Sequence, residues 1–245
     1  MPLSEQYIAG RNAVTEALKS GRPADTLFVA RESSAGGSLG TIISLARAQG
    51  VVVKEAKKEK LEQLCGTGHH QGVVLAAAAH AYAELEDVLA AAQTKGEAPF
   101  VIVCDEIEDP HNLGAILRTA EAAGAHGVVV PRRRSAPLSQ TVARASAGAV
   151  EYIPVARVSN ICAAMETLKA RGLWVYGADM QGEPYDAKPI TGGVALVIGS
   201  EGKGLGRLVK EHCDALLSLP MRGKVGSLNA SVAAGILMYE IAKHR

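Results

Sequence analysis

The sequence predicts an α/β protein built on a mostly parallel sheet with helices on both faces, preceded by a small α/β domain. Two observations carry this prediction. From about residue 100, short runs of Val, Ile and Leu alternate with helical stretches, and these runs are not interrupted by polar residues, as in strands covered on both faces. The chain has 245 residues, of which 48% are hydrophobic, so it can fill the core of one large domain or two modest ones.

Six strands are expected in the larger unit. They are FVIVC at 100–104, GVVVP at 127–131, EYIPV at 151–155, LWVYG at 173–177, ALVIG at 195–199 and ALLSL at 215–219. Ligands of open parallel sheets bind beyond the carboxyl ends of the strands, so the segments that follow these strands are where chemistry is expected.

A smaller unit precedes them and repeats the alternation. Its expected elements are a helix near 11–19, TLFVA at 26–30, a helix near 38–49, VVV at 51–53 and a strand GVVLA that begins at residue 72. We therefore expect a first domain at 1–75, a connecting segment at 76–98 and a second domain at 99–245. The connecting segment is rich in alanine and polar residues, closes with Gly96 and Pro99, and is expected to contain some helix.

Composition excludes several classes of protein. No apolar run approaches the roughly 18 residues that span a bilayer, and the start of the chain lacks the layout of a signal peptide, so we expect a cytoplasmic protein without a membrane partner. The net charge is +1, so contact with nucleic acid would depend on local basic patches.

The cysteines and histidines indicate neither disulfides nor a metal site. No C-x-x-C pair is present, and we expect reduced core residues at Cys65, Cys104, Cys162 and Cys213. Metal-ligand spacing is also missing around His69, His70 and His111, so no metal is expected.

The first candidate segment is DEIEDPHNLGAILRTAEAAGA, which follows the strand at 100–104. Asp109-Pro110 is a typical helix start, and an apolar stripe at helical spacing follows, at Leu113, Ile116, Leu117 and Ala120. Asn112 lies at the mouth of this helix, and Arg118 lies off the stripe. Two interpretations stay open: a cap residue with a solvated charge, or two members of a site.

The second candidate is the glycine-rich loop VIGSEGKGL at 197–205, whose amides are expected to cradle a ligand. It is not a P-loop, because Leu205 and Gly206 stand where Lys and Ser or Thr are needed. It is not a dinucleotide loop either, because Arg207 replaces the third glycine. The Glu201 carboxylate would repel a polyphosphate, so we expect a neutral or cationic ligand.

The third candidate follows the strand that ends at Leu219. A loop containing Arg222 and Lys224 leads to Ser227 and Asn229, which precede a helix that is apolar nearly all round. Such a helix is either a core helix of this domain or buries one face against a second copy of the chain. The Ser and Asn have a simpler explanation as N-caps.

Taken together, these segments resemble a known enzyme family. NLGAILRTA at 112–120, VIGSEGKGL at 197–205 and SLNASVAAGIL at 227–237, in this order, are similar to the three motifs of the SpoU (TrmH) branch of the SPOUT RNA 2'-O-ribose methyltransferases. YIAGRNAVTEAL at 7–18 resembles the small substrate-binding domain of some members. The resemblance is greatest to members that methylate a guanosine ribose in 23S ribosomal RNA.

The resemblance implies a fold and a cofactor that the strand pattern does not give. It implies a trefoil knot near the carboxyl terminus, S-adenosyl-L-methionine held in that knot, and a homodimer built through the catalytic domains. A sulfonium cation without phosphate suits a loop that contains a carboxylate. The implied cofactor-binding residues are Ile198, Gly199, Ser200, Gly202, Leu219, Met221 and Leu228. The implied catalytic residues are Asn112, Arg118, Glu201, Ser227 and Asn229.

For this reaction we expect Arg118 to clamp the phosphate beside the target ribose, since a guanidinium does not readily give up its proton. Glu201 is expected to hold Arg118 or a backbone donor in place. The residues expected to contact ribosomal RNA, or a pre-ribosomal particle, are Arg11, Asn12, Lys19 and Arg22, with Arg132, Arg133, Arg134, Arg222 and Lys224. Three alternatives stay open: a transfer-RNA ribose methyltransferase, an inactive RNA-binding scaffold, and a Rossmann-type nucleotide enzyme.

Overall fold

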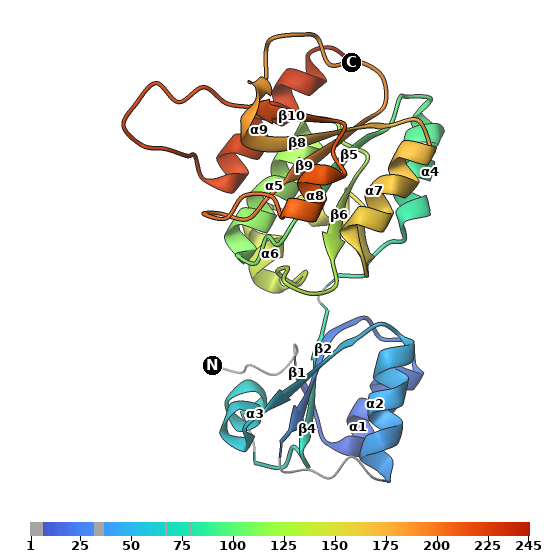
Figure 1. Cartoon of the computed structure of the whole chain (residues 1–245). Helices are drawn as coiled ribbons and strands as arrows, with labels where there is room; N and C mark the ends of the chain where they lie inside the picture. The colour runs from blue at the N-terminus through green and yellow to red at the C-terminus, as the bar shows by residue number, and fades with distance from the viewer. Residues whose placement is uncertain (1–6, 32–36, 67, 79) are drawn as a thin grey trace. The chain divides into compact units, whose positions relative to one another are not determined.

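The computed structural model describes residues 7–31, 37–66, 68–78 and 80–245. The chain divides into two compact units, Met1–Ala81 and Tyr82–Arg245 (Figure 1). Among the described residues, no helix is both long enough and apolar enough to cross a membrane.

The first unit is a mixed sheet with helices on both faces. Its described elements are β1 (Tyr7–Ala9), α1 (Arg11–Lys19), β2 (Ala24–Ala30), α2 (Ser38–Ala48), β3 (Val52–Ala56), α3 (Lys58–Cys65) and β4 (Val73–Ala77). The strand order is β1-β4-β2-β3, with β2 and β3 parallel and the other pairs antiparallel. Helices α1 and α2 bury residues such as Leu18 and Ile42 against one face, and α3 covers the other face with Leu61.

The second unit carries the predicted parallel sheet. Its strands are β5 (Phe100–Cys104), β6 (Gly127–Pro131), β7 (Val155–Val158), β8 (Trp174–Pro184), β9 (Val194–Ile198) and β10 (Ala215–Ser218). Its helices are α4 (Leu85–Lys95), α5 (Pro110–Ala122), α6 (Gln140–Ala145), α7 (Ile161–Ala170), α8 (Arg207–Glu211) and α9 (Ala230–Ala242), with a 3₁₀ turn at Ala149–Glu151. The strand order is β10-β8-β9-β5-β6-β7, and every pair is parallel.

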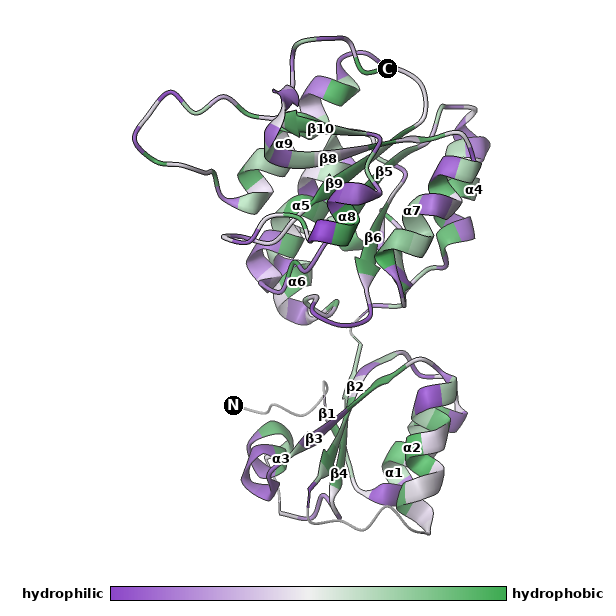
Figure 2. Cartoon of the chain, viewed as in Figure 1, coloured by the Kyte–Doolittle hydropathy of each residue, from purple (hydrophilic) through white to green (hydrophobic). Residues whose placement is uncertain are grey.

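Two layers of helices cover this sheet. Residues of α5, α6 and α9 pack on one face, and residues of α4, α7 and α8 pack on the other. The central strands are apolar along their length (Figure 2), and every residue of β5 and β9 is buried. The expectation of strands covered on both faces is confirmed, because these positions have no solvent side.

One expected strand is placed wrongly. The EYIPV stretch at 151–155 is a 3₁₀ turn at its start, and pairing with β6 begins only at Val155. Pro154 has no N–H to donate to the ladder, so the strand starts after it. The Pro154 carbonyl still accepts from the amide of Val128 at 2.9 Å.

The segment expected to connect the two domains is largely structured. Strand β4 extends to Ala77, and α4 begins at Leu85 behind a capping box formed by Glu84 and Asp87. The apolar side of α4 packs into the core of the second unit with Val88 and its neighbours. The helix expected in this segment is present as α4, and it belongs to the second unit.

The cysteines carry no disulfide. All four are free, Cys104 is fully buried and the other three are half-buried, so the expectation of core residues holds in full only for Cys104. Burial raises the pKa of Cys104 to about 12, with a smaller contribution from the nearby charge of Asp105. Burial likewise raises the pKa of Cys213 to about 12. Both thiols are therefore protonated at neutral pH.

The trefoil knot that the resemblance implies stays a prediction.

Candidate active site

A cavity of about 470 Å³ opens at the carboxyl ends of β8, β9 and β10. It is lined from the loop after β9, the segment after β10 and the first turns of α9. All seven residues expected to bind the cofactor line it, namely Ile198, Gly199, Ser200, Gly202, Leu219, Met221 and Leu228. The structure thus brings them together where parallel sheets place their ligands.

The loop after β9 closes tightly on itself. The amide of Ser200 donates to the Gly204 carbonyl at 3.2 Å, and the amide of Gly204 donates back at 2.9 Å. A Cβ at Gly199 would lie 2.2 Å from the Gly204 carbonyl carbon, so no larger residue fits there without moving the backbone. Beyond the loop, the buried Asp105 carboxylate accepts the amide of Gly206 at 2.8 Å. The loop is therefore fixed at both ends.

Three of the residues expected to be catalytic meet in a hydrogen-bonded triangle. The Asn112 Nδ2 group donates to Glu201 Oε2 at 3.1 Å. Asn229 Nδ2 donates to Asn112 Oδ1 at 2.9 Å and to Glu201 Oε2 at 3.4 Å. These residues are 89 and 117 positions from Asn112 in sequence, so only the fold unites them.

Two residues of the triangle, Asn112 and Asn229, are positioned by the starts of helices. Asp109 caps α5 and accepts the backbone amide of Asn112 at 3.0 Å. Asn229 caps α9, because its Oδ1 accepts the amides of Ser231 and Val232 at 3.0 and 3.3 Å. Its Nδ2 belongs to the triangle at the same time. The cap interpretation is therefore confirmed for Asn229, and its catalytic role stays a prediction.

The other two expected catalytic residues lie apart from the triangle. Ser227 lines the cavity but does not cap α9. Arg118 is exposed on α5, lines neither this cavity nor the neighbouring one, and makes no hydrogen bond or ion pair with any described residue. Within the chain, Glu201 accepts from the side-chain amides of Asn112 and Asn229, at the starts of α5 and α9. That Glu201 holds Arg118 or a backbone donor stays a prediction.

A smaller cavity of about 260 Å³ adjoins the first, and Ser200, Glu201 and Lys203 line both. Asn112 and three acidic residues complete much of its wall: Glu106, Glu108 and Asp109. Glu201 thus lies between a larger, mostly apolar cavity and a smaller, acidic one. A group held in either cavity would lie beside the triangle.

Sequence reasoning missed an ion pair in the wall of the larger cavity. Lys210 Nζ lies 2.5 Å from Asp179 Oδ2, and the Gln181 amide donates to Asp179 Oδ1 at 3.0 Å. Burial alone would raise the pKa of Asp179, but the hydrogen bonds from Lys210 and Gln181 outweigh it and hold that pKa below its ordinary value. Asp179 lies two residues beyond LWVYG, so a search beyond every strand would have found it.

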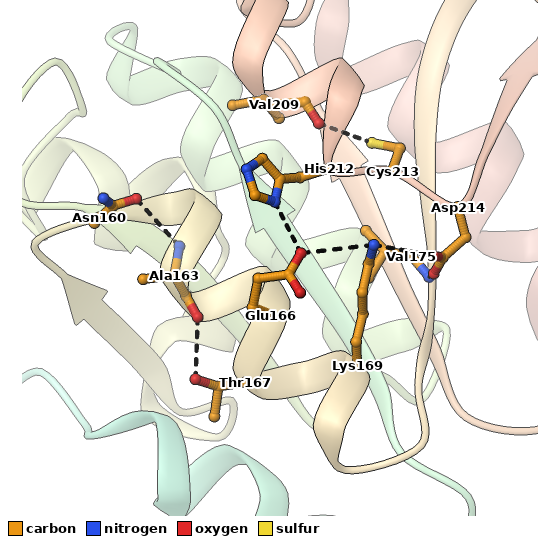
Figure 3. Close-up of polar contacts among 10 residues, drawn as sticks. All are labelled: Asn160, Ala163, Glu166, Thr167, Lys169, Val175, Val209, His212, Cys213 and Asp214. Carbon is orange, nitrogen blue, oxygen red and sulfur yellow. Dashed lines mark hydrogen bonds and ion pairs between the residues drawn. The ribbon is translucent and has the colours of Figure 1, made fainter.

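A polar network fixes the segment that carries Lys210 (Figure 3). Glu166 of α7 accepts from His212 Nδ1 at 2.8 Å and lies 3.7 Å from Lys169 Nζ. Lys169 pairs with Asp214 at 3.0 Å, and Asp214 accepts the amide of Val175 at 2.8 Å. The hydrogen bond from His212 holds the pKa of Glu166 below its ordinary value. Helix α8 is thereby tied to α7 and β8.

The residues expected to bind RNA in the first unit do not gather on one patch. In the first unit, Arg11 and Asn12 line a cavity at the start of α1. Lys19 lies at the far end of α1, about 12 Å along the axis, where it pairs with Glu16, and Arg22 follows it.

In the second unit, Arg134 pairs with Glu106 at 2.5 Å and is not a free cation. The other expected cations of this unit are exposed, at Arg132, Arg133, Arg222 and Lys224. In the described part of the chain, no three His, Cys, Asp or Glu side chains are grouped to hold a metal ion.

Comparison with known proteins covers both units. The SpoU rRNA Methylase family matches residues 99–239, and the family of RNA 2'-O ribose methyltransferase substrate-binding domains matches residues 7–83. The Bacillus subtilis (strain 168) protein YacO, whose name assigns it to the TrmH family of tRNA/rRNA methyltransferases, is 53% identical over 247 residues, which cover 100% of this chain and 98% of YacO.

Solved structures are similar as well. The AdoMet-bound rRNA methyltransferase from Sinorhizobium meliloti has a TM-score of 0.61 and 28% identity, over 98% of this chain and 87% of that one. The A. aeolicus TrmH/SpoU tRNA modifying enzyme has a TM-score of 0.54 and 26% identity, over 66% of this chain and 80% of that one.

Proposed function

The chain belongs to the SpoU rRNA methylase family, and we propose that it transfers a methyl group from S-adenosylmethionine to the 2'-hydroxyl of a guanosine ribose in 23S ribosomal RNA. The observation that carries the proposal is the triangle of Asn112, Glu201 and Asn229. It unites the three motif segments beside a cavity that suits the cofactor.

The donor set of the larger cavity fits S-adenosylmethionine. Backbone groups of a tight glycine loop and apolar side chains such as Leu219 and Leu228 suit a nucleoside and a thioether chain. Lys210 pairs with Asp179, and the Glu201 carboxylate, bonded among the described residues only by neutral side-chain amides, lies at the cavity wall where it favours a cation over phosphate. When bound, the cofactor supplies an electrophilic methyl group on a sulfonium.

The residues of the triangle orient the ribose. Asn112 and Asn229 are held by Glu201 and by their helix caps, so their amide groups lose little freedom when they contact a sugar hydroxyl. Ser227 offers a further hydroxyl from the cavity wall. Arg118 is the phosphate clamp, because its guanidinium stays charged and binds phosphate in a bidentate manner.

The position of Arg118 favours a homodimer. Helix α9 leaves an apolar face exposed, with Val232 and Tyr239 at 50% and 56% exposure. This helix lies along α5, where a Cβ at Gly235 would lie 3.6 Å from the Thr119 side chain, next to Arg118. A second copy seated on this face buries it and brings Arg118 to the site of its partner.

The choice of ribosomal RNA is supported by the extent of the similarities. The rRNA enzyme of Sinorhizobium meliloti matches 98% of this chain, both units included. The tRNA modifying enzyme of A. aeolicus matches 66%, about the share of the chain that the second unit makes up. A separate substrate-binding unit is thus a feature shared with the rRNA enzyme.

The test is transfer of tritiated methyl groups from S-adenosylmethionine to RNA from cells that lack this chain. We expect label in 23S ribosomal RNA and 2'-O-methylguanosine after digestion to nucleosides. Label in transfer RNA alone would replace the proposal by the tRNA alternative. Absence of both transfer and calorimetric cofactor binding would leave an inactive scaffold.

A further inference from the structure

The first unit contains a cavity whose cationic side chains are not balanced by carboxylates in the described part of its wall, unlike those of the active-site cavity. It has a volume of about 680 Å³, and its wall includes Arg11, Asn12, Ser38, Lys58, His70 and Gln71. None of the described residues that line it is an Asp or Glu. A cavity lined by two cations and no carboxylate is suited to an anion.

Three helices begin at this cavity. Arg11, Ser38 and Lys58 are the first residues of α1, α2 and α3, which have nine, eleven and eight residues. In none of the three does the side chain of the N-cap residue accept a hydrogen bond from the helix, although Gln71 Oε1 accepts the first amide of α1. The positive ends of the helix dipoles therefore add to the two cations. Glu59, in the first turn of α3, does not line the cavity.

The cationic side chain at the first helix start is already oriented. Arg11 Nε donates to the Gln71 carbonyl at 3.2 Å, and Arg11 Nη1 donates to Ser38 Oγ at 3.0 Å. The Arg11 backbone amide also donates to Gln71 Oε1 at 2.9 Å. Since these bonds fix the guanidinium, binding an anion costs little side-chain entropy.

The buried side chain of His70 is an independent observation that points to a ligand. Its side chain is buried, with 1% of the residue exposed, and it forms part of the cavity wall. Nδ1 accepts the amide of Gly72 at 3.0 Å, so the neutral ring carries its proton on Nε2. That Nε2 group has no hydrogen-bond partner among the described residues. Buried donors are rarely left unpaired, so this one indicates an acceptor that the described part of the chain does not provide.

We propose that this cavity binds an unpaired nucleotide of the substrate RNA, with its phosphate on Arg11, Lys58 and the three helix starts and an acceptor atom on His70 Nε2–H. The inference rests on the proposed function, which makes RNA the substrate. The cavity has room for more than a phosphate. His70 Nε2–H is a buried donor, whereas Arg11 and Lys58 are cationic side chains. We therefore assign His70 to the nucleoside part of the nucleotide and the cations to its phosphate.

His70→Asn separates the ligand donor from the structural hydrogen bond. Asparagine keeps an acceptor near the position of Nδ1 for the Gly72 amide and removes the Nε2 donor. Lys58→Gln removes one cation, and Lys60→Gln is its matched control, exposed on the same helix and outside the cavity wall. Circular dichroism melting checks that each variant is folded.

The measurement is binding of the full chain to purified ribosomal RNA by filter retention, over a range of salt concentrations. We expect His70→Asn and Lys58→Gln each to weaken binding about tenfold. Lys58→Gln should also lower the slope of log K against log salt by about 0.7, as for one lost contact to a single strand. Lys60→Gln should leave affinity within about twofold of the original chain. Calorimetric affinity for S-adenosylmethionine should not change in any of them.

Two results would overturn the inference. One is RNA affinity within twofold of the original chain in both His70→Asn and Lys58→Gln. The other is binding of guanosine monophosphate or inorganic phosphate as tightly as RNA, which would assign the cavity to a small anion. If instead the variants weaken RNA binding while the original chain transfers no methyl group, the cavity assignment holds and the proposed function fails.

Discussion

The two units carry cavities with different sets of charged side chains. The cavity of the second unit holds two carboxylates, Glu201 and Asp179, together with Lys203 and Lys210, beside a glycine loop and apolar side chains. The cavity of the first unit holds Arg11 and Lys58 beside the starts of three helices, and the described part of its wall has no carboxylate. The net charge of +1 does not reveal this difference. On the proposed function, the cofactor and the RNA are bound in separate units, so variants should impair one without the other.

The largest expected effect comes from Gly199→Ala. The added Cβ would lie 2.2 to 2.4 Å from backbone atoms of Gly204 and Leu205, which have no room to yield. We expect calorimetric affinity for S-adenosylmethionine to fall by about 100-fold or more, with methyl transfer lost and RNA binding unchanged. Gly223→Ala is the control, because nothing lies within 4 Å of its added Cβ. Cofactor affinity within threefold of the original chain in Gly199→Ala would contradict the assignment of this loop.

Arg118→Ala should separate chemistry from cofactor binding. We expect methyl transfer to fall by about 100-fold, since a charge-stabilising contact is lost, while S-adenosylmethionine binds as before. Loss of cofactor binding would count against the role as phosphate clamp. Mixing Arg118→Ala copies with Glu201→Gln copies sharpens the test. If Arg118 serves its partner's site, one site of each mixed dimer is intact and activity returns; if it serves its own chain, none returns.

Asn229 allows the cap and the site to be tested apart. Asn229→Ala removes both, and should lower the free energy of unfolding by about 1 kcal/mol as well as slow methyl transfer. Asn229→Ser keeps a neutral oxygen that can cap α9, loses the Nδ2 donor to Asn112 and Glu201, and adds no second carboxylate beside Glu201. We expect stability close to the original chain and slow transfer, measured by urea unfolding and by the tritium assay. Equal stability loss in both variants would assign the triangle a structural role alone.

The smallest expected effect concerns the response of the second unit to acid. Burial, assisted by the charges of Arg245 and Lys95, lowers the pKa of His126 despite the opposing effect of Glu97. The folded chain thus keeps this ring neutral. Its contribution to stability is complete above the unfolded pKa of about 6.5, and it decreases as pH falls from there toward the lowered folded pKa.

His126→Asn tests this contribution. The variant keeps an acceptor for the Phe100 amide, which His126 Nδ1 accepts at 3.0 Å, but does not titrate. The dependence of the urea midpoint on pH between about 6.5 and 5 should be weaker in the variant than in the original chain. An unchanged slope would assign the acid sensitivity of the second unit to other groups.

Sequence patterns predicted the buried strands of the second unit because residues such as those of β5 and β9 are apolar on both sides. They did not predict α3, since Leu61 is its only buried residue and the rest reads as a polar loop. The strand at Val155 was misplaced because Pro154 delays pairing, an effect of one missing donor within an apolar run.

The site was predictable to the extent that motifs mark it. Spacing and resemblance predicted the members of the triangle. Its contacts join residues far apart in sequence, so the sequence could not show that Glu201 accepts from side-chain amides of the same chain. The pair of Asp179 and Lys210 was missed for the same reason. The unpaired Nε2 group of His70 is a property of three-dimensional packing and leaves no trace in composition or spacing.

The double duty of Asn229 constrains how this chain can change over evolutionary time. A descendant that gave up catalysis but retained its architecture would still need an oxygen to start its last helix, and Ser, Thr or Asp would serve. Only Asn also donates toward Glu201 from that place. On the proposed function, the residue at this position therefore distinguishes active from inactive relatives better than the apolar residues around it do.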